Sequence, residues 1–247
     1  MTLIGEILVR HLSSIGELPE PDRSALVALD GPIVEIGRLR DCLKQGQHPK
    51  DVVLVLSGLL YRYTINRQGA RQIHCFYLPN EAPSLETLYI DYMDNNLGAV
   101  VDSRVALIPH ERFYEVIDKY PEARKLLWRQ TLVQGAIFRE WLVRNSNQPA
   151  QAAFAHLLCE MYTRADAAGL VEDNCFDLPI TQQFVADALG LTTVHVNRTF
   201  QLLKQSGTFE WQGRQFRMID FDRLARIADF KANYLHLRRG EAAKKTS

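Results

Sequence analysis

The fold of this chain is decided by residues 181–205, TQQFVADALGLTTVHVNRTFQLLKQ. Thr181 is a suitable N-cap, because its hydroxyl can accept an early backbone N–H of a helix. Apolar side chains then recur at helical spacing on one face, at Phe184, Val185, Ala188 and Leu189. Gly190 follows where helices often end in left-handed backbone, and a second helix is predicted to begin at Thr192 or Thr193.

Small and apolar residues around this turn have the spacing of a helix-turn-helix. Ala186, Gly190 and Val196 fall four and six residues apart, at positions where two helices pack closely. Phe200 and Leu203 continue the inward face of the second helix. An ordinary pair of packed helices is the alternative that the same spacing allows.

The outer face of the second predicted helix is polar and carries no carboxylate. Its side chains are all able to hydrogen-bond, at Thr193, His195, Asn197, Arg198 and Gln201. No acidic residue lies between Asp187 and Glu210. A merely solvated helix face would normally mix both signs of charge, so this pattern favours a helix that lies in DNA.

Composition limits the class of protein. The 247 residues are 47% hydrophobic and 23% charged, as in a soluble globular protein. No apolar run approaches ~18 residues and no cleavable leader is visible, so we expect a cytoplasmic protein without a membrane partner. The cysteines are scattered without a CxxC pair, which argues against a disulfide framework, a zinc ribbon or an N-terminal four-cysteine iron–sulfur site. They are Cys42, Cys75, Cys159 and Cys175.

The distribution of charge is more informative than its sum. The formal net charge is zero, which by itself predicts no nucleic-acid partner. From residue 190 to residue 218, however, Glu210 is the only acid among four cations, Arg198, Lys204, Arg214 and Arg217. A local basic region on a neutral chain suits a specific DNA binder better than a nonspecific coating protein.

The run LGLTTVHVNRTFQLLKQSG resembles the recognition region of the Crp/Fnr family of bacterial transcription regulators. Upstream, LSGLLYRYTINRQGARQIHCFYLP is similar to the sensor barrel of that family, and FREWLVRNSNQPAQAAFAHLLCEMYTR to its connection between dimer helix and DNA-binding domain. The resemblance covers roughly residues 20–235. It implies an α+β chain with an N-terminal cyclic-nucleotide-binding-like β jelly-roll barrel, a long dimerisation helix and a C-terminal winged helix-turn-helix.

The hydrophobic pattern divides the chain in the same way. The first 30 residues read as helix interrupted by Pro19 and Pro21, and short β-type runs follow at 52–56, 59–65, 71–78, 98–101 and 105–108. NSNQP is a polar break at 145–149. We therefore expect a sensor barrel with flanking helices and dimerisation helix at 1–145, a winged helix-turn-helix at 146–240, and a disordered tail at 241–247. In the second part, the wing should turn at Gln212–Gly213 and a last helix should run from Asp222 to Leu237.

A long helix predicted to end near residue 145 carries two apolar stripes. One contains Leu126, Val133, Ile137 and Trp141, and the opposite one contains Trp128, Leu132, Gly135, Phe138 and Leu142. Two opposed stripes need two partners, so we expect the first to pack on the barrel. The second is the predicted dimer interface, where a small glycine would let two helices approach. A helix enclosed within one subunit is the alternative, and the family resemblance favours the dimer.

The resemblance also assigns residues to DNA. Arg198 matches the base-reading arginine of the family, whose fork can contact a guanine, although a phosphate contact is the alternative. Thr193 and Val194 occupy the other base-facing positions, where relatives carry charged residues, so their operator sequence is not transferable. The phosphate contacts expected are Gln183, Thr192, His195, Asn197, Arg214 and Arg217.

The predicted barrel lacks the usual signs of a cyclic nucleotide site. Relatives that bind one hold its phosphate with a Gly-Glu stretch and a nearby arginine, but no Lys or Arg lies between Gln72 and Ser103. That segment carries five acids instead, at Glu81, Glu86, Asp91, Asp94 and Asp102. The sequence thus argues against cyclic AMP and indicates no cofactor. It shows no catalytic motif and no metal-ligand cluster, so we expect no enzyme.

Together these features predict a homodimeric, sequence-specific transcription regulator that binds a palindromic site in double-stranded DNA, gated by an unidentified signal in the barrel. RNA polymerase is a further candidate partner. Two alternatives remain open. One is a constitutive DNA binder without effector, and the other is a ligand-binding or protein-interaction module with a degenerate DNA-binding domain.

Overall fold

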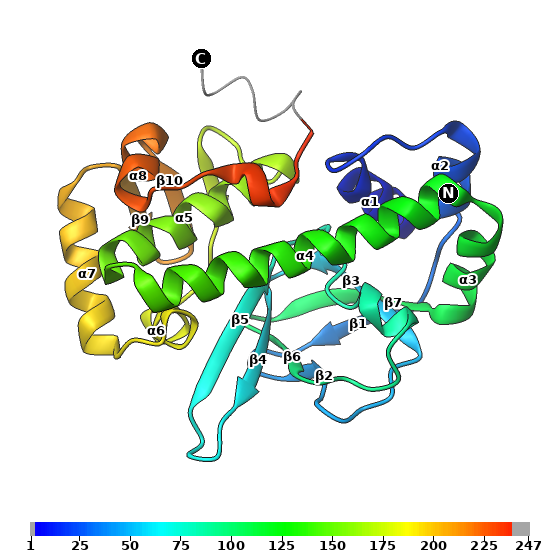
Figure 1. Ribbon diagram of the computed structural model, residues 1–247, viewed down its shortest axis with the longest axis horizontal. Helices are drawn as coiled ribbons and strands as arrows, with labels where there is room; N and C mark the ends of the chain where they lie inside the picture. Colours follow the sequence, from blue (N-terminus) through cyan, green and yellow to red (C-terminus); the bar gives the residue numbers. More distant parts are fainter. Residues whose placement is uncertain (1–2, 239–247) are drawn as a thin grey trace. The chain divides into compact units, whose positions relative to one another are not determined.

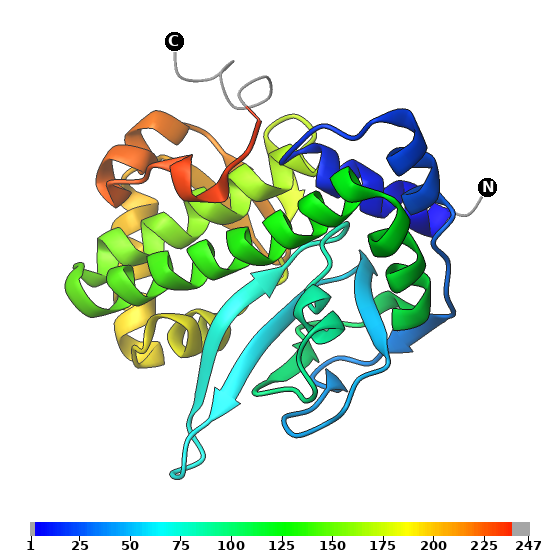
Figure 2. The same ribbon diagram turned by 45° about the vertical axis from the view of Figure 1, so that its right-hand side comes forward.

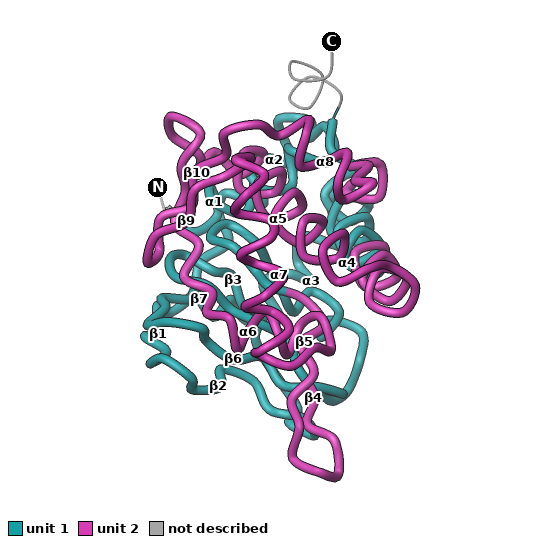
Figure 3. Tube along the Cα trace, turned by 90° about the vertical axis from the view of Figure 1, so that its left-hand side faces the viewer, with its two compact units in different colours: residues 1–63, 76–135, 236–247 teal, residues 64–75, 136–235 magenta. Residues whose placement is uncertain are grey.

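The computed structural model describes residues 3–238 of the chain. Its contacts divide them into two compact units, coloured separately in Figure 3. Unit 1 holds residues 3–63, 76–135 and 236–238, and unit 2 holds residues 64–75 and 136–235. The division falls inside a helix, so the domain boundary expected at 145 stays a prediction. The tail expected at 241–247 lies outside the described residues.

Unit 1 begins with two helices, α1 (Leu3–Ser13) and α2 (Glu20–Val27). Pro21 lies in the first turn of α2, where the missing N–H of proline removes no helical hydrogen bond. The proline therefore helps to begin this helix and does not interrupt it, which corrects the expectation from sequence. Leu8, Leu12 and Leu26 are fully buried in the core of the unit.

The expected barrel is present as two antiparallel sheets (Figures 1 and 2). Its strands are β1 (Ile33–Ile36), β2 (Asp41–Leu43), β3 (Asp51–Ser57), β4 (Leu60–Ile65), β5 (Arg71–Tyr77), β6 (Asn96–Ala99) and β7 (Ser103–Pro109). The sheets have the orders β1-β7-β3 and β2-β6-β4-β5. A 3-10 turn, η1 (Leu85–Leu88), lies between β5 and β6. This arrangement confirms the α+β class and the N-terminal barrel.

Helix α3 (His110–Lys119) leads into α4 (Pro121–Asn147), the long green helix of Figure 1. At 27 residues α4 is about 40 Å long. Its start is fixed within unit 1 because Asp22 Oδ1 accepts a hydrogen bond from Ala123 N at 2.8 Å. The stripe of α4 expected to pack inward is buried, since Leu126, Val133, Ile137 and Trp141 are each at most 6% exposed.

The rest of unit 2 is a small domain of helices and short strands. Its elements are α5 (Ala150–Ala167), β8 (Cys175–Asp177), α6 (Gln182–Leu189), α7 (Thr193–Gln205), β9 (Phe209–Gln212), β10 (Gln215–Met218), α8 (Phe221–Ala228) and η2 (Ala232–Leu235). Strands β8, β10 and β9 form one antiparallel sheet, in which the wing hairpin of β9 and β10 is extended by β8.

Two sequence expectations for this region need correction. Gln212 pairs with Gln215, which places the wing turn at Gly213–Arg214, one residue later than expected. The last helix ends at Ala228 and does not continue to Leu237. Asp229 has left-handed backbone (φ 46°), which ends α8, and the separate turn η2 follows.

Candidate DNA-binding surface

The turn between α6 and α7 has the predicted geometry. Gly190 ends α6 with φ 66°, a backbone conformation that side chains with a Cβ rarely adopt. The next residue closes the turn, since Leu191 N donates to Ala186 O at 3.0 Å. Thr192 is the N-cap of α7 and accepts a hydrogen bond from His195 N. Thr181 lies at the N-cap of α6, but its side chain makes no capping hydrogen bond.

Helix α7 separates an apolar face from an exposed one. Val196 and Leu203 are fully buried, whereas Val194 is 80% exposed. The other predicted DNA-contacting residues of this helix are exposed as well, at Thr193, His195, Asn197 and Arg198. At 100° per residue, Thr193 and Asn197 form one row, and Val194 and Arg198 the adjacent one. The structure thus brings the predicted base-contacting residues onto one exposed strip.

Several predicted phosphate contacts already have protein partners. Gln183 Nε2 donates to Asp187 Oδ1 at 2.7 Å, and Asn197 Nδ2 donates to Gln182 Oε1 at 3.2 Å. The first pair spans four residues of α6, a spacing that the sequence could have revealed. The Asn197 pair joins residues 15 positions apart and could be seen only once α6 and α7 had packed.

The wing is attached to α7 through aromatic side chains. The ring of Phe200 lies 6.0 Å from that of Trp211 on β9, and Phe209 stacks on Phe216 of β10 at 5.4 Å between centroids. The alternation along β10 buries Phe216 and leaves Arg217 exposed. Aromatic pairs of this geometry add to the stability from buried area. They fix the wing arginines relative to the exposed strip of α7.

The stripe of α4 predicted to be a dimer interface is largely uncovered in the single chain. Trp128 is 57% exposed, Leu132 54% and Leu142 71%, while Gly135 and Phe138 are partly exposed. Large apolar side chains exposed in a row are typical of a surface that another molecule covers. The dimer itself stays a prediction.

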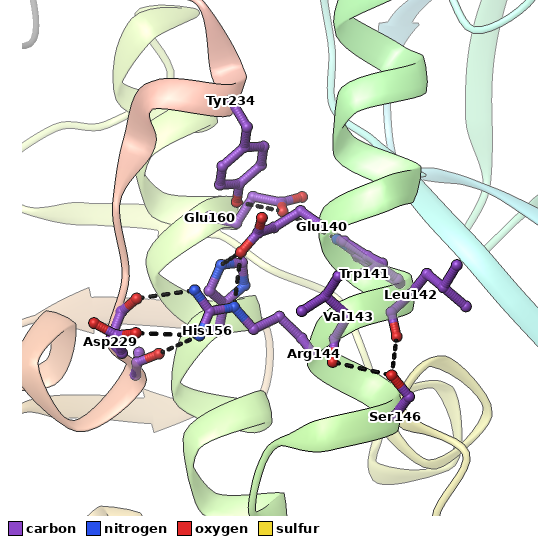
Figure 4. A network of polar contacts seen from close by, with 11 residues as sticks. Glu140, Trp141, Leu142, Val143, Arg144, Ser146, His156, Glu160, Asp229 and Tyr234 are labelled. Carbon is purple, nitrogen blue, oxygen red and sulfur yellow. Dashed lines mark hydrogen bonds and ion pairs between the residues drawn. The ribbon is translucent and has the colours of Figure 1, made fainter.

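A buried polar network supports the DNA-binding domain within unit 2 (Figure 4). The carboxylate of Glu160 accepts from Trp141 Nε1 at 3.0 Å, from Tyr234 Oη at 2.7 Å and from Arg164 Nη1 at 3.0 Å. Burial raises the pKa of Glu160, and the Arg164 charge opposes that shift. The network therefore ties α4, α5 and η2 together behind the helix-turn-helix.

Arg144 extends the same network to the end of α8. Its guanidinium donates to Glu140 Oε1 at 2.7 Å, to Ala228 O at 3.2 Å and to Asp229 O at 2.9 Å. The two carbonyls belong to the end of a helix, where no backbone N–H within the helix can satisfy them. Arg144 therefore caps α8, a role that no local sequence signal indicated.

The barrel contains a cation that the sequence could not place. Arg62, on β4, is 4% exposed, and its Nη2 donates to Pro83 O and pairs with Glu86. The segment between Gln72 and Ser103, which has no Lys or Arg of its own, is therefore contacted by the guanidinium of Arg62. The carboxylate of Glu86 already neutralises that guanidinium. Glu81 is also buried and accepts from Leu78 N at 2.8 Å.

The cysteines of the described chain are free thiols. Burial raises the pKa of Cys42 to about 12 and that of Cys159 well above its ordinary value, so both are neutral at physiological pH. Cys75 is buried in β5, and Arg164 Nη1 lies 3.7 Å from its sulfur.

Within residues 3–238, no group of three or more His, Cys, Asp or Glu side chains could hold a metal ion. None of the helices described there has the length and hydropathy needed to cross a membrane.

Comparison with known proteins agrees with this geometry. Residues 153–227 match the Crp-like helix-turn-helix domain. The chain is 28% identical over 185 residues to the transcriptional activator protein FnrA of Stutzerimonas stutzeri, covering 75% of each chain. It is 29% identical over 180 residues to FnrL of Cereibacter sphaeroides, covering 70% of this chain and 71% of the relative. These relatives are transcription regulators.

Solved structures of this kind share the fold. The structure of FixK2 from Bradyrhizobium japonicum superimposes with a TM-score of 0.74 at 22% identity, over 83% of this chain and all of that one. A CRP/FNR family regulator from Thermus thermophilus superimposes with a TM-score of 0.61 at 19% identity, over 81% and 99% of the two chains. Residues 153–227 thus form a helix-turn-helix of the Crp-like type, and the whole chain, with its wing and N-terminal barrel, is similar in sequence and fold to regulators of the Crp/Fnr family.

Proposed function

We propose that this regulator binds a palindromic DNA site as a homodimer and reads its sequence with the exposed strip of α7, Thr193, Val194 and Arg198. The observation that carries the proposal is the strip itself. Its residues lie on one face, with an arginine beside an 80% exposed valine, and no carboxylate is present on α7. A guanidinium can read a guanine and a methyl group can contact thymine.

A selection experiment tests this proposal. The full chain is incubated with random double-stranded DNA, and the recovered sequences are determined. We expect an inverted repeat whose half-sites lie about 34–36 Å apart, one helical turn, because two-fold symmetric proteins select two-fold symmetric sites. Affinity for the selected site should fall steeply with salt as phosphate-bound counterions are released.

A control distinguishes the effect of the α7 strip on DNA selection from the effect of the total charge of the protein. Arg198→Glu should abolish selection, whereas Arg23→Glu, an equal charge change at an exposed residue of α2, should leave the selected sequence unchanged. Recovery of unrelated sequences by the unsubstituted protein would instead favour a degenerate DNA-binding domain.

The exposed apolar stripe of α4 supports the dimer, and the barrel supports a gated regulator. In this proposal, a signal in the barrel changes the packing of the two α4 helices and hence the spacing of the two α7 helices. The relatives named above are transcriptional activators, which makes RNA polymerase a candidate partner. The alternative of a constitutive binder can be tested on the protein purified from its own host. If removal of small molecules left its affinity for the DNA site unchanged, the protein would be constitutive.

A further inference from the structure

The tip of the β4–β5 hairpin belongs to unit 2. Residues 64–75 belong to the same compact unit as the helix-turn-helix (Figure 3), and their strands β4 and β5 are neighbours in the sheet β2-β6-β4-β5. The loop at the tip is tightly hydrogen-bonded, since Asn66 Oδ1 accepts from Gln68 N and Ala70 N, both at 2.9 Å. The first residue after this loop region, Arg71, begins β5.

Arg71 binds α6 in three ways. Its Nη2 lies 2.6 Å from Asp187 Oδ2, and its Nε donates to the same oxygen at 2.7 Å. Its guanidinium also lies over the ring of Phe184, 4.8 Å from the centroid. The side chains of the ion pair are mostly buried, with 24% of Arg71 and 12% of Asp187 exposed. A shielded, stacked arginine of this kind is held far more firmly than a surface ion pair.

A second contact lies at the end of α6. Gln72 Nε2 donates to Ala188 O at 3.3 Å, and Asn145 Nδ2 donates to the same carbonyl at 2.7 Å. Ala188 is in the last turn of α6, whose carbonyls lack partners within the helix. The hairpin therefore supplies both a counter-charge and a C-terminal hydrogen bond to the first helix of the helix-turn-helix.

The positive charge of Arg71 bears on DNA binding because its partner Asp187 also contacts a residue predicted to bind phosphate. Asp187 also accepts from Gln183, one of the predicted phosphate contacts. It is the only acid of α6, and no other acid follows before Glu210. Without Arg71, a carboxylate with no cationic partner of its own would remain beside that contact and would repel phosphate.

We propose that Arg71 is a positioning residue of the DNA-binding surface, which neutralises Asp187 and holds α6 in place within unit 2. The proposal rests on the proposed function, since it assigns α6 and α7 to DNA. Arg71 itself contacts no base and no phosphate in this proposal. It acts through Asp187 and Gln183, so its loss must be compensated by removing the charge of Asp187.

The experiment is a double-mutant cycle on the selected DNA site. Arg71→Met should weaken binding on the order of tenfold, because each subunit then presents an uncompensated carboxylate. Arg67→Met removes the same charge from an exposed residue of the same hairpin and should change affinity less than twofold. Asp187→Asn should restore Arg71→Met to within about twofold of Asp187→Asn alone.

Hydrogen exchange supplies a readout independent of DNA. In Arg71→Met, the amides of residues 182–191 should exchange faster than in Arg67→Met, while the amides of the barrel strand β3 should exchange at similar rates in both variants. Equal weakening by the two hairpin variants, or additive effects of Arg71→Met and Asp187→Asn, would overturn the proposal. If the unsubstituted protein bound no DNA, both this inference and the proposed function would fail. If it bound DNA and the cycle showed no coupling, only this inference would fail.

Discussion

The guanidinium of Arg214 pairs with the carboxylate of Asp177 at the edge of the wing sheet. Arg214 Nε donates to Asp177 Oδ1 at 3.0 Å, and Nη2 contacts the other carboxylate oxygen. The hydrogen bond to Asp177 raises the pKa of Arg214 and so favours its charged form. Both side chains are about half exposed, which screens the pair from adding much stability. A predicted phosphate contact thus shares its charge with an acid 37 residues away.

This pairing predicts opposite effects for its two members. Arg214→Ala should weaken binding to all DNA sequences alike and lower the salt-dependence slope by about one per neutralised phosphate. Asp177→Asn should strengthen binding, because the guanidinium is then free for phosphate. Filter binding at several salt concentrations measures both effects, with Glu172→Gln, at an exposed acid near the same sheet, as the control. An unchanged affinity in Asp177→Asn would remove Arg214 from the phosphate contacts.

Arg198 should determine sequence preference. Arg198→Ala is expected to cost about 1–3 kcal/mol per half-site on the selected DNA and to relax preference at one base pair. Lys204→Ala, at an exposed cation in the last turn of α7, should weaken binding without altering the selected sequence. Binding to a randomised half-site library at two salt concentrations distinguishes the two. If the arginine variant selects the same sequence and only lowers the salt slope, Arg198 is a phosphate contact.

The exposed stripe of α4 should hold two chains together. Gly135→Glu combined with Leu142→Glu would place like charges in the predicted dimer interface. Because glutamate favours helix, α4 itself should persist in the double variant. We expect sedimentation analysis to show monomers. Arg129→Glu, an equal change of charge at an exposed residue of α4 away from the stripe, should leave the dimer intact. A double variant that still sediments as a dimer would place the interface elsewhere.

The barrel should not bind cyclic AMP. The buried guanidinium of Arg62 is paired with Glu86 and Pro83 O, so a cyclic phosphate would have to displace a carboxylate from it. Calorimetric titration of the protein should therefore show no saturable heat at micromolar cyclic AMP. Saturable binding at one site per subunit would contradict this prediction directly.

His156 should make stability depend on pH. Burial, aided by the charge of Arg144, lowers its pKa to about 3. The carboxylate of Glu140 lies 3.5 Å from its Nε2, but Arg144 binds the same oxygen and offsets the attraction. Because the unfolded chain gains a proton below pH ~6.5 and the folded one does not, stability is complete above that pH and is lost as the pH falls toward 3.

The expected loss from His156 is about 1.4 kcal/mol per pH unit within that window. His156→Gln removes the titrating group and keeps a side chain of similar length. Denaturant unfolding of both proteins between pH 4 and pH 7 gives the contribution of the histidine as the difference between their free energies of unfolding. If the free energy of unfolding varied with pH in the same way in both proteins, His156 would take up its proton in the folded state as well.

The sequence predicted those parts of the fold that depend on local signals. Gly190 and the apolar spacing of α6 and α7 placed the helix-turn-helix, because a left-handed cap and a helical stripe are both readable from a few residues. The early end of α8 was missed because it requires Asp229, a non-glycine residue, to adopt left-handed backbone. Its carbonyl is held by Arg144, which is 85 residues away, and no pattern within the helix indicates that contact.

The electrostatics of the site were less predictable than its shape. The sequence correctly identified the exposed strip of α7, but not that Asp177 would meet Arg214 or that Asp187 would meet Arg71. Both pairs bring together residues from different elements, and the second spans 116 residues. The count of charges along residues 190–218 therefore treated Arg214 as free to meet DNA, although it is paired with Asp177.

The pair formed by Arg62 and Glu86 restricts how this barrel could change over evolutionary time. Losing either partner alone leaves a charge in a largely buried position, at a cost on the order of 3 kcal/mol, so neither residue drifts freely. A lineage that came to bind an anion here would keep the arginine and let the ligand take the place of the glutamate. The interior charge of the barrel is thus held as a pair, and an anionic ligand would have to replace a side chain in order to bind there.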